Sequence, residues 1–173
     1  MWLKSEKVPV PKIKSELSSW LSHAKRIVIA GIGNPIRRDD FVGVRIVQNL
    51  SKKRLENVML IECETVPESF SQQIVDFEPT HVLLIDAAVL DLQPGEGKLV
   101  EPEMLVAPPS FSSHMLPLRM FCEYVQRMTN AKIALLLIQP KETDFGEELS
   151  LELKASAKQV SEILASLLRE KQA

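Results

Sequence analysis

The chain has 173 residues, 45% of them hydrophobic, and its 21 basic and 23 acidic side chains give a net charge of −2. This length suits one domain with a sizeable core, so we expect residues 1–173 to form a single domain. The near balance of charge argues against nucleic acid or a membrane surface as the partner. It favours a small ligand or another protein.

The two cysteines, Cys63 and Cys122, stand far apart in the sequence. This spacing argues against a zinc ribbon or a disulfide framework and predicts buried free thiols. Residues 1–7 carry charges and lack the apolar core of a signal peptide, and no apolar run approaches the ~18 residues of a membrane span. We therefore expect a cytoplasmic protein, with a monomer as the default.

The first third of the chain predicts a helix followed by a βα unit. Apolar residues recur at helical spacing over residues 12–23, so we expect an amphipathic helix that packs on a sheet as part of an N-terminal extension, residues 1–25. A strand over residues 26–30, a glycine-containing loop and a helix over residues 40–52 follow, and the helix has one apolar face.

The middle of the chain continues this alternation. We predict a strand over residues 58–62, a helix over residues 68–77 and a strand over residues 81–85. Because the third strand is apolar on consecutive residues, it is expected to be buried on both faces. A short strand over residues 98–101 and a loop over residues 102–113 follow, and a loop of this length is often functional.

Three further elements are predicted in the last third of the chain. They are a helix over residues 114–128 with Pro117 in its first turn, an apolar strand over residues 132–138, and a helix over residues 149–171 with one buried stripe. Gln139 and the proline after it end the strand.

The alternation of strands and helices predicts an α/β fold over residues 26–173. We expect a three-layer, open, twisted and mostly parallel sheet of about five strands, with helices on both faces. In a flavodoxin-like strand order, the first strand lies between the second and the third, and a crevice opens between the ends of the first and third strands. Asp40 and Asp86 follow these two strands and would lie on opposite sides of that crevice.

Asp40, Asp86 and His114 are the candidate site residues. Asp86 follows four apolar residues, where an acid is costly unless it is exposed, paired or bound to a metal. Two carboxylates and one imidazole suit a divalent metal ion. The structural alternatives are a first-turn acid for Asp40 and a capping or hydrogen-bonding role for His114. Asp39 should point about 100° away from Asp40, and we expect it to cap the helix N-terminus.

Gly31 and Gly33 follow the first strand, as glycines do in dinucleotide-binding folds. The third glycine of that fingerprint is absent, because Ile36 occupies its position, so a nucleotide site is not favoured. The two glycines either form a tight turn or face a ligand. The chain also lacks Asp-Thr-Gly, G-x-S-x-G and H-E-x-x-H, the signatures of several common hydrolases.

Other polar residues have less specific interpretations. Glu62, Glu64 and Glu68 lie near the end of the second strand, so either one of them reaches the crevice or all are solvated acids around a helix start. His23 is interpreted as a surface residue and His81 as an edge residue.

A binding module is the alternative to an enzyme. Bacterial receiver domains also carry an acidic pair after the first strand and a phosphoacceptor aspartate after the third, which would be Asp86. Here, however, residues 31–38 separate the first strand from the acidic pair. Gln139 also stands where receivers have the lysine that contacts the phosphoryl group.

Residues 31–40, Gly-Ile-Gly-Asn-Pro-Ile-Arg-Arg-Asp-Asp, resemble the opening of the NiFe-hydrogenase maturation endopeptidases. Residues 79–87, 94–96, 112–118 and 137–140 continue the resemblance, which points to the branch that serves formate-hydrogenlyase-type hydrogenases. Because several motifs agree in order and spacing, the resemblance is more specific than any one of them.

The resemblance implies an aspartic-type, nickel-dependent endopeptidase that removes the C-terminal peptide of a hydrogenase large-subunit precursor after nickel insertion. In this family the nickel arrives with the substrate, and the matching positions that contact it are Asp40, Asp86 and His114. Two departures put the identity of the substrate in doubt. Residues 62–65, Glu-Cys-Glu-Thr, replace an Asp-Gly-Gly-Ser or Asp-Gly-Gly-Thr segment, and Phe41 replaces a glycine.

Overall fold

The computed structural model describes residues 10–105 and 115–172. Its strands form one sheet in the order β2-β1-β3-β5-β4. They are β1 (Ile27–Ile32), β2 (Val58–Glu64), β3 (His81–Ala87), β4 (Gly97–Val100) and β5 (Lys132–Ile138). All neighbours pair in parallel except β4, which runs antiparallel to β5 at one edge. The predicted five-stranded, mostly parallel sheet is confirmed, and so is the position of β1 between β2 and β3.

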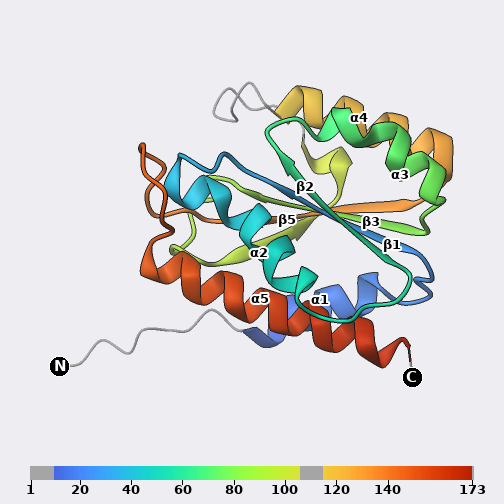
Figure 1. Cartoon of the computed structure of the whole chain (residues 1–173), viewed down its shortest axis with the longest axis horizontal. Helices are drawn as coiled ribbons and strands as arrows, with labels where there is room; N and C mark the ends of the chain where they lie inside the picture. The colour runs from blue at the N-terminus through green and yellow to red at the C-terminus, as the bar shows by residue number, and fades with distance from the viewer. Residues whose placement is uncertain (1–9, 106–114, 173) are drawn as a thin grey trace.

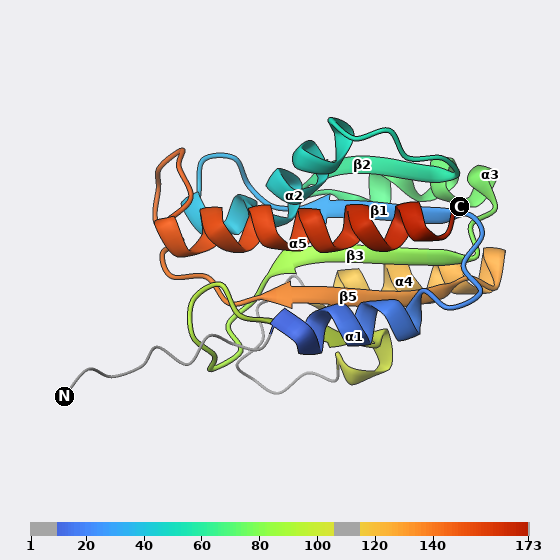
Figure 2. The ribbon, with the colours of Figure 1, turned by 90° about the horizontal axis from the view of Figure 1, so that it is seen from below.

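Helices cover both faces of this sheet (Figures 1 and 2). One face is covered by α1 (Val10–Trp20), α2 (Val42–Ser51) and α5 (Leu151–Glu170), and the other by α3 (Ser71–Phe77) and α4 (Met115–Thr129). The predicted three-layer α/β fold is therefore confirmed. Within residues 10–105 and 115–172, no helix combines the length and the apolar character that crossing a membrane requires.

The strands are buried on both faces because their side chains alternate between two apolar clusters. Ile27 and Ile29 of β1 pack with α1, α2 and α5, whereas Val28 and Ala30 pack with α3 and α4. A strand presents successive side chains to opposite faces, so a strand in the middle of three layers must be apolar at every position. This explains the apolar run in β3, where the sequence predicted burial on both faces.

The ends of several elements differ from the sequence prediction. β3 runs to Ala87 rather than to residue 85, because Asp86 and Ala87 continue the pairing with β5 beyond the apolar run. The helix predicted to begin at residue 40 begins at Val42, and the residues before it form the 3-10 helix η1 (Arg38–Phe41). The helix predicted over residues 68–77 is likewise divided into η2 (Pro67–Phe70) and α3. A further 3-10 turn, η3 (Pro102–Met104), follows β4.

His81 is buried, so its interpretation as an edge residue is wrong. Its ring meets that of Trp20 edge-on, with the ring centroids 5.0 Å apart. Burial, together with the positive charge of Lys132, lowers the pKa of His81. Trp20 ends α1, and Leu17 of the same helix is fully buried, which confirms the predicted packing of this helix on the sheet. His23 is exposed, as expected.

Cys63 and Cys122 are buried free thiols, as predicted. Both belong to the apolar cluster beneath α3 and α4. Burial raises the pKa of each thiol to about 12, and the nearby charge of Glu68 acts in the same direction on Cys63. At neutral pH both side chains are therefore protonated, and they pack as small apolar residues.

Candidate active site

Asp40 and Asp86 come together at the edge of the sheet where β1 and β3 end. Asp40 lies in η1, which packs against β3, and Asp86 is the next-to-last residue of β3. Both side chains are half-buried. The negative charge of Asp40 acts on the titration of Asp86, as expected only for close neighbours. The sequence predicted that these two residues lie at the same edge of the sheet, and the structure brings them together there. We call this edge, where the parallel strands end, the rim.

Glycines make this approach possible. A Cβ atom on Gly43, in the first turn of α2, would lie 2.1 Å from the backbone oxygen of Ile85. A Cβ atom on Gly31 would lie 2.3 Å from the backbone oxygen of Gly43, and one on Gly33 would lie 2.1 Å from that of Asp40. The start of α2 therefore rests directly on the ends of β1 and β3. The structure thus gives Gly31 and Gly33 a role in close backbone packing, which neither the tight turn nor the ligand-facing role had predicted.

The loop between β1 and η1 holds the Asp40 side chain. The backbone N–H of Asn34 donates a hydrogen bond of 2.9 Å to Oδ2 of Asp40, and the side-chain oxygen of Asn34 accepts one of 3.1 Å from the N–H of Ile36. The N–H of Asp40 in turn donates to the backbone oxygen of Arg37. The carboxylate is therefore held in place, and it remains half-exposed at the rim.

Asp86 has a strongly shifted pKa. Burial is the main cause, the negative charge of Asp40 is the second, and together they raise the pKa of Asp86 from 3.8 to about 8. A hydrogen bond of 2.8 Å from the N–H of Ala87 to Oδ1 of Asp86 acts in the opposite direction. At neutral pH Asp86 is therefore largely protonated. A neutral carboxylic acid beside the charge of another carboxylate is an arrangement that general acid–base catalysis uses.

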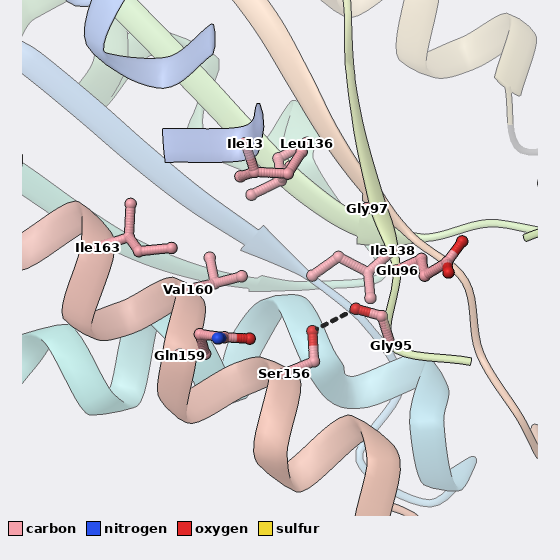
Figure 3. A pocket seen from close by; sticks show the side chains of 10 residues that line it. All are labelled: Ile13, Gly95, Glu96, Gly97, Leu136, Ile138, Ser156, Gln159, Val160 and Ile163. Carbon is pink, nitrogen blue, oxygen red and sulfur yellow. Dashed lines mark hydrogen bonds between the residues drawn. The ribbon is translucent and has the colours of Figure 1, made fainter. Parts of the chain in front are cut away.

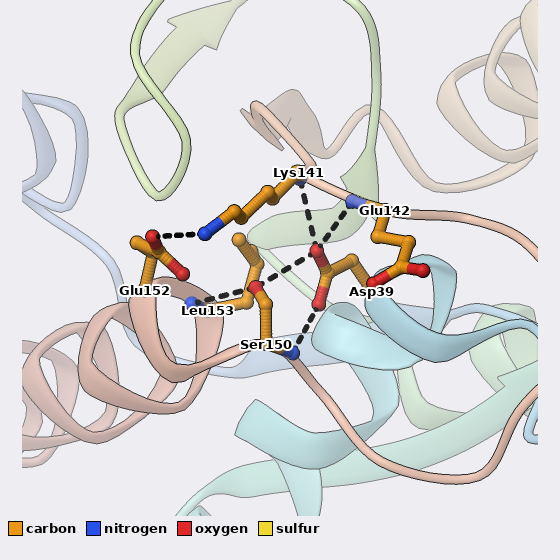
Figure 4. Close-up of polar contacts among 6 residues, drawn as sticks. All are labelled: Asp39, Lys141, Glu142, Ser150, Glu152 and Leu153. Carbon is orange, nitrogen blue, oxygen red and sulfur yellow. Dashed lines mark hydrogen bonds and ion pairs between the residues drawn. The ribbon is translucent and has the colours of Figure 1, made fainter.

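Asp39 points away from Asp40, but it does not cap the helix that follows it, so that prediction is wrong. Its fully buried carboxylate binds the segment between β5 and α5 (Figure 4). Oδ2 accepts hydrogen bonds of 2.9 Å from the N–H groups of Lys141 and Glu142 and from the hydroxyl of Ser150. Oδ1 accepts one of 2.7 Å from the N–H of Ser150, which is the N-cap of α5. Asp39 thus joins the Asp40 loop to a distant part of the chain.

Gln139 organises the segment that follows Asp86, a role that the sequence did not predict. Its side-chain oxygen accepts hydrogen bonds of 2.6 Å from the N–H of Leu90 and 3.4 Å from the N–H of Leu92. The signal in the sequence was the position of Gln139 directly after a fully apolar strand. Since only the folded sheet brings residues 90 and 139 together, the contact itself was not predictable from that position.

The glutamates near the end of β2 do not join the acidic pair. Glu62, Glu64 and Glu68 are all exposed, and Glu62 accepts a hydrogen bond of 3.2 Å from the side-chain amide of Gln48. Glu64 contributes through its backbone instead, because its carbonyl oxygen accepts a hydrogen bond of 2.7 Å from the N–H of Gly33. The alternative of solvated acids is therefore the one observed.

His114, the third predicted site residue, lies outside the described residues. Among the residues that the structure describes, no group of three or more histidine, cysteine, aspartate or glutamate side chains is arranged to hold a metal ion. Of the three predicted site residues, the structure therefore describes Asp40 and Asp86 alone.

A small cavity lies elsewhere, between α1, α5 and the edge of the sheet (Figure 3). It has a volume of about 50 Å³, and its walls include Ile13, Leu136 and Val160. Ser156 and Gly95 also line it, and the hydroxyl of Ser156 donates a hydrogen bond of 2.8 Å to the backbone oxygen of Gly95. The cavity contains neither member of the acidic pair, and we interpret it as a packing gap beneath α1.

Comparison with known proteins agrees with this geometry. The family model described as hydrogenase maturation protease matches residues 44–167. A Methanocaldococcus jannaschii protein named as a hydrogenase maturation protease is 35% identical, and the match covers 91% of this chain and 97% of that protein. The crystal structure of a NiFe hydrogenase maturation protease from Thermococcus kodakarensis KOD1 is similar with a TM-score of 0.83 and 33% identity, over 89% of this chain and 99% of that one.

A hydrogenase maturating endopeptidase from Escherichia coli shares the fold, with a TM-score of 0.72 and 24% identity over 85% of this chain and 94% of that one. The family model covers more than half of the sequence, and the archaeal relative is matched over nearly all of its length. The chain therefore belongs to the hydrogenase maturation protease family.

Proposed function

We propose that this peptidase removes the C-terminal peptide of a NiFe-hydrogenase large-subunit precursor after nickel has been inserted. The substrate-borne nickel is recognised by Asp40, Asp86 and His114. The observation that carries the proposal is the acidic pair: two half-buried carboxyl groups at the rim, one of which raises the pKa of the other. A positive charge brought by the substrate would relieve this repulsion.

The ligand chemistry suits nickel. Carboxylate oxygens and an imidazole bind borderline divalent ions, and three protein ligands leave positions for groups of the precursor or for water. Since metal ligands must be deprotonated, docking of the nickel-loaded precursor would release the proton of Asp86. The positive charge of the nickel ion is therefore what allows the acidic pair to distinguish nickel-loaded precursor from nickel-free precursor.

Two mechanisms of peptide cleavage are compatible with this site. In the first, nickel acts as a Lewis acid that polarises the peptide carbonyl or activates water, while a carboxylate that is not bound to nickel acts as the base. In the second, nickel only positions the peptide, and the carboxyl groups act as general acid and general base. The raised pKa of Asp86 supports the second mechanism only for an Asp86 that is not bound to nickel. The neutral acid is able to donate a proton to the leaving amine, whereas a nickel ligand has already lost that proton.

The test compares nickel-loaded with nickel-free precursor and follows the mass of the large subunit. We expect cleavage of the nickel-loaded form alone, at a single C-terminal position. Equal cleavage of both forms would contradict nickel recognition, and cleavage of neither would contradict the proposed function.

The receiver alternative is not favoured, because Gln139 replaces the lysine of receivers and its side chain is bound to the segment after Asp86. It predicts labelling by acetyl phosphate that disappears in Asp86→Asn. We expect no such labelling.

A further inference from the structure

The segment between β5 and α5, residues 139–150, is bonded to both sides of the acidic pair. On the Asp40 side, the N–H of Arg38 donates to the backbone oxygen of Gly146 at 3.0 Å, and the N–H of Gly146 donates to that of Ile36 at 2.9 Å. On the Asp86 side, Gln139 holds the segment that follows β3. The segment thus connects the loop that follows β1 with the loop that follows β3, so the three lie together on one surface.

Exposed apolar side chains are concentrated on these loops. Among the described residues, ten large apolar side chains are exposed, and six of them follow strands at the carboxyl edge of the sheet, where the acidic pair lies. These six are Ile36, Val66, Val89, Leu92, Phe145 and Leu151. Exposed apolar side chains gathered around a site mark a surface that binds another molecule.

Phe145 is the most prominent of those near the acidic pair, with 78% of its surface exposed. The guanidinium of Arg37 lies over its ring, 5.8 Å from the centroid, and Nε of Arg37 donates a hydrogen bond of 3.2 Å to the backbone oxygen of Thr143. Ile36 and Phe145 each precede one member of the β-bridge between Arg37 and Gly146. The two apolar side chains are therefore neighbours on a backbone that is already ordered, which lowers the entropic cost of binding.

Val89 belongs to the other side of the pair. It lies three residues after Asp86 and is 70% exposed. The neighbouring N–H of Leu90 is held by Gln139, so the position of this segment is also fixed. Ile36, at 50% exposure, lies four residues before Asp40. Exposed apolar side chains thus lie within four residues of each aspartate along the chain.

We propose that Ile36, Val89 and Phe145 form a docking surface for the hydrogenase large-subunit precursor, through apolar side chains near its cleaved peptide bond. This inference rests on the proposed function. A protein partner fits because the charged residues that accompany the three side chains have both signs: Arg37, Lys141 and Glu142. A nucleic acid or an anionic membrane would need a positive excess. Aromatic side chains in such positions often carry much of the binding energy.

The test measures cleavage of nickel-loaded precursor by Phe145→Ser and Val89→Ser. The matched control is Met128→Ser, since Met128 is 54% exposed near the end of α4, which leads into β5 from the opposite edge of the sheet. We expect KM to rise at least about tenfold in both rim variants with kcat nearly unchanged, and no change in the control. Equal thermal unfolding of all three variants and the wild type checks that the fold is retained.

Three results would overturn this inference. If KM for Phe145→Ser and Val89→Ser equals KM for Met128→Ser, the surface does not bind the precursor. A rise in the monomer fraction of Phe145→Ser without a change in KM would assign the surface to a second copy of the chain. Failure of the wild type to cleave the nickel-loaded precursor would contradict the proposed function itself. The assignment of this surface to the precursor would then be contradicted as well.

Discussion

The carboxyl group of Asp86 is the side chain on which the chemistry of this rim depends most. Burial and the charge of Asp40 raise its pKa to about 8, so the folded protein holds this proton far more tightly than the unfolded chain does. The raised pKa prepares Asp86 to donate a proton, and it also means that ionising this side chain lowers the stability of the folded protein. Stability and the proposed activity are therefore opposed at this residue.

The pH dependence of stability follows from this shift. Since the folded pKa lies above the ordinary value of 3.8, the contribution of Asp86 is fully present below about pH 4 and is lost as the pH rises through about 8. We expect metal-free Asp86→Asn to exceed the wild type in free energy of unfolding by roughly 2 kcal/mol or more at pH 9. Chemical denaturation at pH 5 and pH 9 measures the difference. A difference that does not grow with pH would refute the raised pKa.

Asp39 provides a second prediction for a single residue. Its buried carboxylate accepts four hydrogen bonds from residues 141–150, and bonds to a charged group contribute about 1.5–3 kcal/mol each before losses in the partners are counted. We expect Asp39→Ala to lower the free energy of unfolding by about 3 kcal/mol and to speed amide exchange at Lys141 and Ser150. Asp144→Ala, an exposed acid on the same segment, serves as the control. Unchanged exchange in Asp39→Ala would contradict the role of Asp39.

At the scale of elements, the contact between α2 and the sheet positions the site. Gly31 and Gly43 allow the backbone of α2 to touch the ends of β1 and β3. Asp40 lies in η1, two residues before this helix begins. Any side chain at either glycine would move η1 and its carboxylate away from Asp86.

Gly43→Ala tests this contact. The added methyl group would lie 2.1 Å from the backbone oxygen of Ile85, and backbone on both sides leaves little room to relax. We expect a loss of about 3 kcal/mol in unfolding free energy together with a loss of precursor cleavage. Gly97→Ala is the comparison, because its nearest contact would be 3.3 Å. Equal stability of the two variants would mean that α2 does not rest on the sheet as described.

The elements also show which parts of the structure the sequence was able to predict. Continuous apolar runs identified β3 and β5 because burial on both faces leaves a local pattern. The end of β3 was missed because Asp86 and Ala87 continue pairing with β5, and pairing depends on the partner strand. The burial of His81 beneath Trp20 and the bonds of Asp39 to Ser150 were missed for the same reason, since both join residues far apart in the chain.

At the scale of the whole molecule, the candidate functional residues are concentrated at one edge of the sheet. Three loops after β1, β3 and β5 meet there, carry the acidic pair, and present exposed apolar side chains. Parallel sheets of this type bind ligands where the carboxyl ends of their strands meet. The topology explains why Asp40 and Asp86 were identifiable from their positions after two apolar strands. The loop contacts that hold them required the folded chain.

Cleavage of nickel-loaded precursor by Asp40→Asn and Asp86→Asn, compared with Asp144→Asn, tests the role of the acidic pair most directly. All three variants remove one potential negative charge from the same rim, and each keeps the shape of its side chain. We expect cleavage to be lost in Asp40→Asn and Asp86→Asn and to be unchanged in Asp144→Asn. Cleavage at the wild-type rate by either of the first two variants would contradict the assignment of the acidic pair as the active site.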